Sequence, residues 1–367
     1  MTPSHLTFER HPHPSPRPAP ERDAILAAPG FGRHFTDHMV TIAWTADRGW
    51  HNARLEPYAP IPMDPSNMTL HYGQAIFEGL KAYAQPDKTT ALFRPESNAR
   101  RFQLSARRLA MPELPVETFV EACELLVRED AGWVPQEPEH TLYLRPFMIA
   151  SENSLGVRPA ASYLFAVIAT PAGAYFPGGV EPVSVWVSQQ YVRAAPGGTG
   201  AAKCAGNYAA SLIAQAEAAE QGCDQVVWLD ALERRWIEEV GVMNLCFVYG
   251  TGQDATIVTP RLTDTLLAGV TRDSLLTLAE ELGYATRETR ISVEDWRTGC
   301  ADGTISEVFA CGTAAVITPV GQAKTADTSW TIADGRPGPV AMRLREALLR
   351  RQTGADADPH GWLRPCA

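Results

Sequence analysis

The chain has 367 residues, of which 45% are hydrophobic and 20% charged, a balance typical of globular proteins and a length sufficient for two domains. Its formal net charge is −10, and no basic cluster is long enough to follow a nucleic-acid backbone or an anionic membrane surface. No window of about 18 apolar residues occurs, so we expect no membrane-spanning helix.

The seven cysteines are scattered along the chain, and none forms a Cys-x-x-Cys pair. An odd number without such a pair is typical of a reducing compartment rather than of a disulfide framework or a zinc site. The nine histidines also lack the spacing of metal ligands. We therefore expect a cytoplasmic protein without a metal site.

Residues 1–29 form a proline-rich leader that lacks the apolar core of a secretory signal. We expect this leader to be flexible, with ordered structure beginning near Phe31. In the first half, hydrophobic periodicity predicts strands at 39–44, 49–55, 81–84, 91–94, 141–151 and 162–170, and helices at 96–109 and 116–131. Residues 71–80 are apolar and small at helical spacing, which favours a helical run before the strand at 81–84.

A segment dense in proline and glycine then separates the two halves. In the second half we expect strands at 183–191, 225–230, 236–249, 286–291 and 306–318, the last broken by a tight turn, and helices at 207–221, 266–283, 293–299 and 340–351. The tail after residue 351 is expected to be loose.

Strands outnumber helices in this pattern, and they mix hairpin and crossover spacings. The fold class is therefore α+β or mixed α/β, in two domains. We predict a small N-terminal α/β domain at 30–170, a connection at 171–182, and a larger C-terminal domain at 183–367.

The lysine at position 203 is surrounded by small residues, in Thr199-Gly-Ala-Ala-Lys-Cys-Ala-Gly-Asn-Tyr-Ala209. Small neighbours let a bulky group approach the amine, which could form an imine with an aldehyde cofactor. Taken alone, however, this lysine is more simply explained as a surface residue of an Ala/Gly-rich loop.

Three other features of the second half suit an anionic cofactor that carries a ring. The segment Gly269–Ser274 begins a helix, whose free N–H groups would hold a phosphate, although capping by Thr271 explains it equally well. The turn Gly312–Ala314 offers a hydroxyl and N–H groups, but an ordinary hairpin turn would do the same. Glu238 and Glu239 lie in an apolar strand, where only one of them should point inward.

Together these parts match the requirements of pyridoxal phosphate, whose phosphate, ring nitrogen and aldehyde need a cup of donors, a carboxylate and an amine. The whole chain from about Phe31 to Arg350 resembles the branched-chain amino acid aminotransferases, which are fold type IV pyridoxal-phosphate enzymes. The resemblance is carried in order by Phe31-Gly, Phe35-Thr-Asp-His38, Leu70-His-Tyr-Gly-Gln-Ala-Ile-Phe-Glu-Gly-Leu-Lys81, Leu92-Phe-Arg-Pro95, Leu142-Tyr-Leu-Arg-Pro146, Tyr175-Phe-Pro-Gly-Gly179, Lys203-Cys-Ala-Gly-Asn-Tyr208, Glu239-Val-Gly-Val-Met-Asn244, Gly269-Val-Thr-Arg272 and Gly312-Thr-Ala314.

The resemblance implies a role for each matching residue of the cofactor site. Lys203 would form the Schiff base and move the substrate proton, and Glu239 rather than Glu238 would pair with the ring nitrogen. Tyr208 would hydrogen-bond the ring hydroxyl. The phosphate would be held by Arg94, Val270, Thr271 and Thr313.

For the substrate, the resemblance implies an aromatic and aliphatic pocket, formed by Phe31, Tyr72, Phe77, Tyr143, Tyr175 and Val242. Arg145, assisted by Tyr72, would bind the γ-carboxylate of glutamate, and the N–H groups of Thr313 and Ala314 the α-carboxylate. Leu155 and Val157, in the loop 154–157, would close the pocket of a second subunit, which makes a homodimer the expected unit.

The implied function is ping-pong amino transfer between leucine, isoleucine or valine and 2-oxoglutarate. The alternatives are another type IV enzyme, a D-amino acid aminotransferase or an aminodeoxychorismate lyase, and a non-catalytic small-molecule-binding protein on the same scaffold. The stretches Phe77-Glu-Gly, Leu142–Pro146 and Tyr175–Gly179 favour the branched-chain group.

Overall fold

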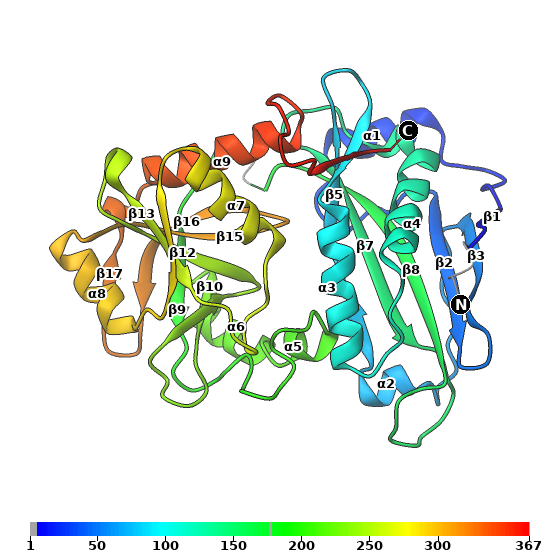
Figure 1. Ribbon diagram of the computed structural model, residues 1–367, viewed down its shortest axis with the longest axis horizontal. Coiled ribbons are helices and arrows are strands. Elements are labelled where there is room, and N and C mark those ends of the chain that lie inside the picture. Colours follow the sequence, from blue (N-terminus) through cyan, green and yellow to red (C-terminus); the bar gives the residue numbers. More distant parts are fainter. Residues whose placement is uncertain (1–5, 176–177, 367) are drawn as a thin grey trace. The chain divides into compact units, whose positions relative to one another are not determined.

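The computed structural model describes residues 6–175 and 178–366. The chain folds as two compact units, each with its own sheet (Figure 1). Unit 1 contains the described residues up to Ala174, the short segment Ala202–Ala205 and the residues from Arg351 onward; unit 2 contains Tyr175–Ala201 and Gly206–Arg350.

The sheet of unit 1 has the strand order β1-β3-β2-β8-β7-β5-β6-β18, with β4 paired to β7. Its strands are β1 (Glu9–Arg10), β2 (His38–Thr45), β3 (Gly49–Pro57), β4 (Ala75–Phe77), β5 (Leu80–Ala84), β6 (Thr90–Phe93), β7 (Thr141–Ala150), β8 (Ser162–Ala172) and β18 (Leu363–Pro365). The helices are α1 (Ala19–Ala27), α2 (Met68–Tyr72), α3 (Pro95–Arg108) and α4 (Val116–Glu129), with a 3-10 turn at Ala131–Trp133.

Helices α3 and α4 pack together and cover the sheet of unit 1 (Figure 1). Their apolar faces supply Phe102 and Phe119, whose ring centroids lie 5.4 Å apart and 5.6 and 6.0 Å from that of Phe165 in β8. All three rings are fully buried, so the helical periodicity of the sequence places one face of each helix in the core.

The leader differs from its predicted flexibility. Residues 9–10 pair in parallel with β3, and α1 forms within the leader. The backbone N–H of His13 donates to His38 Nε2 at 2.8 Å, and that of Arg17 donates to Asp37 Oδ1 at 3.0 Å. Proline fixes φ but leaves the carbonyls and the other N–H groups free to bond, so long-range contacts order a segment whose composition suggested disorder.

The helical run predicted for residues 71–80 is also wrong over most of its length. Helix α2 ends at Tyr72 because Gly73 adopts the left-handed conformation that terminates helices. The chain then forms β4 and β5, which both pair with β7. Sheet pairing with a distant strand therefore overrides the local spacing of apolar residues.

Unit 2 is built on a second sheet, with the order β11-β10-β9-β16-β15-β12-β13-β14 and β17 at the side of β16. Because β11 also pairs with β12, the first six strands of this order close on themselves as a small barrel. The strands are β9 (Val183–Val187), β10 (Gln225–Leu229), β11 (Ile237–Val240), β12 (Met243–Tyr249), β13 (Thr256–Pro260), β14 (Ala285–Thr289), β15 (Ile305–Gly312), β16 (Val316–Lys324) and β17 (Ser329–Thr331).

The helices of the second half begin close to their predicted positions. They are α5 (Ala205–Ala209), α6 (Leu212–Glu220), α7 (Val270–Glu281), α8 (Val293–Asp302) and α9 (Pro339–Gln352), and 3-10 turns occur at Gly252–Asp254 and Ala333–Gly335. The single helix predicted at 207–221 is split into α5 and α6, and helix α7 begins at Val270 rather than at residue 266.

The domain boundaries differ from the prediction at two places. The tail is not loose, because β18 pairs antiparallel with β6 and therefore belongs to unit 1. The segment Ala202–Ala205 also belongs to unit 1, where Cys204 forms a bridge with Ile76 of β4. Of the predicted connection at 171–182, residues 176 and 177 lie outside the described residues.

A buried ion pair joins α3 to the turn before β5. Glu78 is fully buried, and Arg101 donates to both of its carboxylate oxygens at 2.8 Å, from Nε and Nη2. Burial opposes the ionisation of Glu78, but the Arg101 guanidinium beside it holds the pKa of this carboxyl below its usual value. The pair therefore stabilises the fold above the unfolded pKa of about 4.3, and that contribution is lost as the pH falls through the lower folded pKa.

Replacing Arg101 with methionine should lower the free energy of unfolding by about 3–5 kcal/mol at neutral pH, because it leaves a buried carboxylate unpaired. The matched control is Arg107→Met on the same helix, where the exposed Arg107 pairs with Glu113 at 2.8 Å. Denaturant unfolding of both variants would measure the difference. Equal losses would show that the burial of Glu78 does not determine the cost.

Candidate active site

Strand β11 carries the two adjacent acids that the sequence singled out. Both Glu238 and Glu239 are buried, with 7% and 3% of their surface exposed, so burial alone does not distinguish them. Successive residues of a strand face opposite sides, and the two carboxylates accordingly have different partners. Thr265 donates to Glu238, whereas the N–H of Leu267 donates to Glu239.

Glu239 also forms an ion pair with a residue that the sequence analysis missed. Arg193 Nε lies 3.2 Å from Glu239 Oε2, and its side chain is only 7% exposed. Tyr208 and Val242 line the same small cleft as this pair. A buried carboxylate needs such a partner, but the pattern of the sequence could not choose Arg193 among 32 basic residues.

The start of helix α7 has the geometry of an anion site. Gly269 is the residue before the helix, and no side chain among the described residues caps it. Thr271 therefore lies in the first turn rather than at the cap, which removes the ordinary capping explanation. The N–H groups of Val270 and Thr271 belong to the unbonded first turn, where the helix dipole favours a negative charge.

Gly269 is required by close packing rather than by an unusual backbone angle. A Cβ atom at this position would lie 2.0 Å from Oδ1 of Asn244. The Asn244 side chain is buried, and its Nδ2 donates to the carbonyl of Leu267 at 3.1 Å. A side chain at residue 269 would therefore displace Asn244 or shift the first turn of the helix.

Replacing Gly269 with alanine should weaken the binding of pyridoxal phosphate by about tenfold, since a shift of the first turn moves the donors of the anion site. Titration of the apoprotein with the cofactor would measure this change. The control is the double variant with Asn244→Ala, together with Asn244→Ala alone, because the smaller side chain relieves the clash. A Gly269→Ala variant with unchanged cofactor affinity would contradict a phosphate site at this helix.

A second turn of unit 2 carries Thr313 and Ala314. This turn connects β15 to β16, as the sequence predicted. Both residues are partly exposed, and the chain returns through Val316 at a positive φ of 61°. Gly312 faces Met243, since a Cβ there would lie 3.1 Å from Met243 Cγ.

In unit 1 the structure brings five of the predicted site residues together. Phe31 and Tyr143 form an edge contact with ring centroids 5.1 Å apart. The guanidinium of Arg145 lies 4.8 Å from the centroid of Phe77, and its Nη2 donates to the hydroxyl of Tyr143 at 3.1 Å. Lys203 Nζ lies 5.0 Å from the same Phe77 ring. The result is a cluster of three aromatic rings with two cationic groups.

The backbone of Lys203 is fixed within unit 1 by two hydrogen bonds. Its carbonyl accepts from the N–H of Phe77 at 3.0 Å, and its own N–H donates to Ser105 Oγ at 2.9 Å. Ser105 is fully buried on α3. The lysine is therefore held by a strand and a helix, unlike a surface residue of a free loop.

Arg94 begins helix α3 with a left-handed backbone, at φ 53°. Its N–H donates to the carbonyl of Trp362 at 2.7 Å, and its guanidinium lies 4.8 Å from the centroid of the Trp362 ring. The ordered C-terminal tail therefore positions Arg94, a role that the sequence analysis did not foresee.

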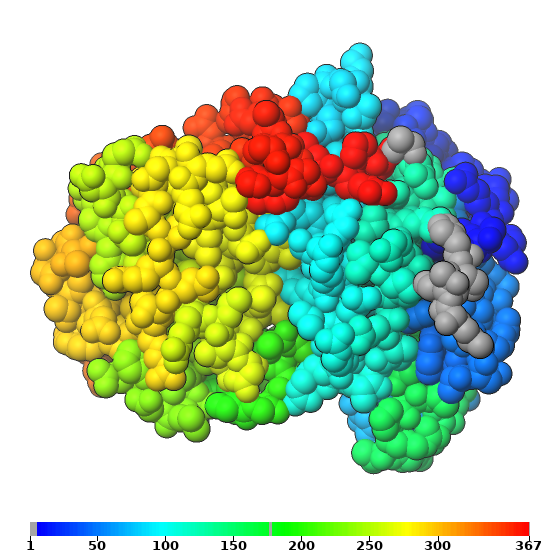
Figure 2. Space-filling model, in the orientation of Figure 1, coloured from blue at the N-terminus to red at the C-terminus, as the bar shows by residue number. Residues whose placement is uncertain are grey.

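The remaining substrate residues lie elsewhere. The hydroxyl of Tyr72 donates to the carbonyl of Leu155, so Tyr72 contacts the 154–157 loop of its own chain. Leu155 and Val157 are exposed by 64% and 83%. Figure 2 shows the segment 151–161 projecting in green at the lower edge of unit 1. Tyr175 belongs to unit 2, where burial raises the pKa of its hydroxyl.

Comparison with known proteins identifies the family of this chain. The family model for amino-transferase class IV matches residues 75–323. The chain is 63% identical over 362 residues to the probable branched-chain-amino-acid aminotransferase of Streptomyces coelicolor, covering 98% of this chain and 99% of the relative. It is 58% identical over 359 residues to the branched-chain-amino-acid aminotransferase of Mycolicibacterium smegmatis, covering 98% of each.

The chain belongs to the branched-chain amino acid aminotransferases. Solved structures of this family share the fold. The Escherichia coli branched-chain amino acid aminotransferase has a TM-score of 0.73 at 30% identity, covering 89% of this chain and 99% of that chain. The branched-chain aminotransferase of Thermoproteus uzoniensis, solved with norvaline, has a TM-score of 0.70 at 26% identity, covering 89% and 100%.

Branched-chain amino acid aminotransferases are pyridoxal-phosphate enzymes of fold type IV, which confirms the predicted fold class, enzyme class and cofactor. Among the described residues, no helix is long and apolar enough to cross a membrane. The same part of the chain contains no cluster of three His, Cys, Asp or Glu side chains that could hold a metal ion.

Proposed function

We propose that this aminotransferase moves the amino group of L-leucine, L-isoleucine or L-valine to 2-oxoglutarate in a reversible ping-pong reaction. The products are a branched 2-oxo acid and L-glutamate. The observation that carries this substrate pair is the cluster of unit 1, in which Arg145 lies against the rings of Phe77 and Tyr143.

That cluster suits two substrates of opposite character. Phe31, Phe77 and Tyr143 offer apolar area to a branched side chain. Arg145 offers a planar fork of donors to the γ-carboxylate of glutamate, and its present partner, the Tyr143 hydroxyl, is neutral. A charged carboxylate would therefore be the stronger partner when glutamate is bound.

The residues present fit pyridoxal phosphate. The first turn of α7, which no described side chain caps, suits a phosphate held by the N–H groups of Val270 and Thr271. We propose that Arg94 and Thr313 complete this phosphate site. When bound, the cofactor supplies an aldehyde that joins Lys203 Nζ and a ring that withdraws electrons from the substrate.

The other residues of the chain hold charges and protons in place. Glu239, supported by Arg193 and by the N–H of Leu267, is proposed to keep a proton on the ring nitrogen. Tyr208, which lines the same cleft, would hydrogen-bond the ring hydroxyl. The Nζ atom of Lys203 would remove the proton from Cα of the amino acid and deliver it to C4′ of the cofactor.

We propose a homodimer in which the 154–157 loop closes the pocket of the second subunit, with the N–H groups of Thr313 and Ala314 holding the α-carboxylate. Leu155 and Val157 are apolar and largely exposed in one chain. Contact with a second subunit would bury these two side chains. Since Tyr72 hydrogen-bonds Leu155, Tyr72 should accompany this loop into the partner's pocket. We propose that Tyr175 and Val242 line the pocket from unit 2.

The test is the absorbance of the purified holoenzyme with single substrates. L-Leucine should shift the cofactor band, and 2-oxoglutarate should then restore it, because each half-reaction completes without the other substrate. D-Leucine is the control for the alternative of a D-amino acid aminotransferase. A band that responds to D-leucine but not to L-leucine would overturn the proposed substrate, and a protein that binds no pyridoxal phosphate would overturn the reaction.

A further inference from the structure

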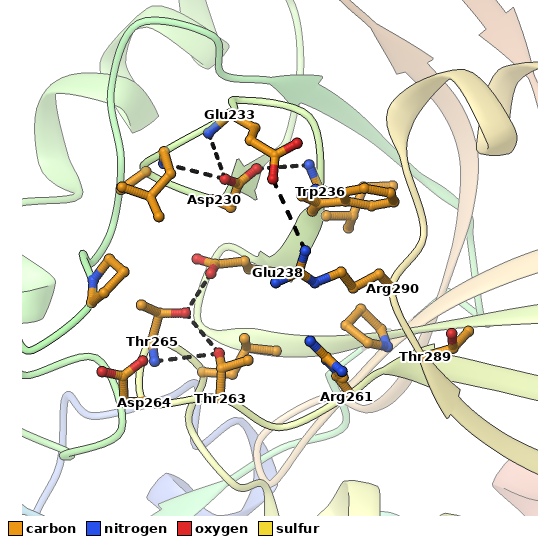
Figure 3. Close-up of a pocket in the computed structure, with 16 residues that line it drawn as sticks. Asp230, Glu233, Trp236, Glu238, Arg261, Thr263, Asp264, Thr265, Thr289 and Arg290 are labelled. Carbon is orange, nitrogen blue, oxygen red and sulfur yellow. Dashed lines mark hydrogen bonds and ion pairs between the residues drawn. The ribbon is translucent and has the colours of Figure 1, made fainter.

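Unit 2 contains a second cavity, on the side of β11 that Glu238 faces. Its volume is about 160 Å³, well above the roughly 10–15 Å³ that a single water occupies by this measure. Figure 3 shows Glu238 among the lining residues, with Thr265 and Thr263 below it, Arg290 to the right and Arg261 to the lower right. Glu239 is not part of this lining.

Glu238 is the buried acid of this cavity. Its Oε1 accepts from the hydroxyl of Thr265, but its Oε2 has no hydrogen-bond partner within the parts of the chain that the structure describes. Burial raises the pKa of this carboxyl. A buried acceptor without a partner is costly, and an ammonium group placed beside it would remove that cost.

The neighbouring acids differ from Glu238 in their hydrogen bonding or in their exposure to solvent. Asp230 accepts four backbone N–H groups, from residues 232, 233, 235 and 236, at 2.7–3.2 Å. Asp264 accepts the N–H of Gly197 at 2.8 Å. Glu233 and Asp264 are exposed to solvent, so Glu238 is the buried acid of this lining.

Two arginines at the exposed side of the cavity supply positive charge, opposite to that of the Glu238 carboxylate. Arg261 and Arg290 both line the cavity and are exposed. Arg290 is 4.0 Å from the exposed Glu233 and lies over the Trp236 ring at 5.4 Å, and such exposed pairs hold a guanidinium weakly. The guanidinium N–H groups of Arg290 and Arg261 can therefore donate to the carboxylate of a ligand.

Apart from Thr289, the rest of the lining is apolar. It includes Ile237 and Leu266, which are nearly fully buried, together with Pro196, Pro260 and Trp236. A buried acid, two exposed arginines and an apolar wall match the three parts of an α-amino acid that carries an apolar side chain.

From these contacts we infer that the cavity is a second binding site, distinct from the active site, for a small zwitterionic α-amino acid with an apolar side chain. Its ammonium group lies at Glu238 Oε2 and the Thr263 hydroxyl, and its carboxylate lies at Arg261 and Arg290. The site needs no turnover and forms on unit 2 alone.

Occupancy of this site has a direct route to Glu239. Glu238 is its neighbour in β11. The hydroxyl of Thr265 donates to Glu238, and the carbonyl of Thr265 accepts from Nη2 of Arg193. Arg193 in turn pairs with Glu239, which also accepts the N–H of Leu267, two residues after Thr265. A ligand that moves Thr265 therefore changes the support of Glu239. This step rests on the proposed role of Glu239 in holding the cofactor.

The test is calorimetric titration of the holoenzyme with cycloleucine, an apolar α-amino acid that lacks an α-hydrogen and so cannot be transaminated. Arg261→Ala and Glu238→Gln should each weaken its binding to the cavity by at least about tenfold. The matched control, Arg297→Ala, removes an exposed arginine of α8 that pairs with Glu294 and should leave binding unchanged. A crystal soaked with cycloleucine should show the molecule beside Glu238.

Kinetics separate this site from the active site. Cycloleucine at the cavity should change kcat for leucine by at least twofold in the wild type but not in Arg261→Ala, whereas binding at the active site would raise KM and shift the cofactor band. Binding that raises only KM and is equal in all the variants would overturn the second site. Cavity binding without a change in kcat would overturn its link to Glu239. The titration tests binding to the cavity and needs no turnover. A failure of the proposed reaction would instead appear as a lack of aminotransferase activity in the assay without cycloleucine.

Discussion

Replacing Lys203 with alanine is expected to abolish amino transfer, with a loss in kcat of at least about 10⁴-fold. The amine at this position is proposed both to bind the cofactor and to move the substrate proton, and the methyl group of alanine can do neither. The measurement is the rate of branched 2-oxo acid formation from L-leucine and 2-oxoglutarate, with the cofactor band recorded on the same sample.

Two controls make the Lys203 prediction specific. Lys203→Arg keeps the positive charge next to Phe77 but removes the nucleophile, so it should be as inactive as alanine. Lys324→Ala changes a lysine whose Nζ donates to the carbonyl of Gln221 at 3.3 Å, and it should remain active. A Lys203→Ala enzyme that still turned over would overturn the assignment.

Replacing Glu239 with glutamine should lower kcat by about 10²-fold or more, since the amide cannot hold a proton on the ring nitrogen by charge. The change also leaves Arg193 buried beside a neutral partner. Steady-state kinetics with saturating pyridoxal phosphate would separate lost catalysis from lost cofactor binding.

Glu238→Gln is the matched control for Glu239→Gln, because the two residues are adjacent and both buried. Burial is the main cause of the raised pKa of Glu238, so glutamine imitates its protonated form. A raised folded pKa means that ionisation opposes folding above the unfolded pKa of about 4.3. Glu238→Gln should therefore be at least as stable as the wild type at neutral pH, and its loss of activity should be much smaller. Equal losses in the two variants would show that the wrong acid was chosen.

Some of the site could be predicted from the sequence because its signals are local. The glycine before a helix at 269, the hairpin turn at 312–314 and the acids within an apolar strand are each visible within a few residues. The resemblance to a known family then gave these pieces roles. The apolar periodicity of α3 and α4 likewise predicts helices whose buried faces the structure confirms.

Other parts could not be predicted because they depend on partners far apart in the chain. Arg193 meets Glu239 across 46 positions, and Arg94 meets Trp362 at the opposite end of the sequence. The leader and the tail have the composition of disordered segments, yet each pairs with a strand of unit 1. No local pattern reports such pairings, because their free energy comes from contacts that exist only after the chain has folded.

The sequence by itself determined the family, the cofactor and the fold class, and it pointed to Lys203 as the proposed reacting lysine, since these follow from ordered motifs and local periodicity. Only the tertiary structure decided the environment of each group. Lys203 belongs to unit 1 through contacts with β4 and α3. Glu239 pairs with Arg193, and Glu238 lines a separate cavity. The physical reason is that burial and charge pairing are properties of neighbours in space, and the same strand can present adjacent carboxylates to two different environments.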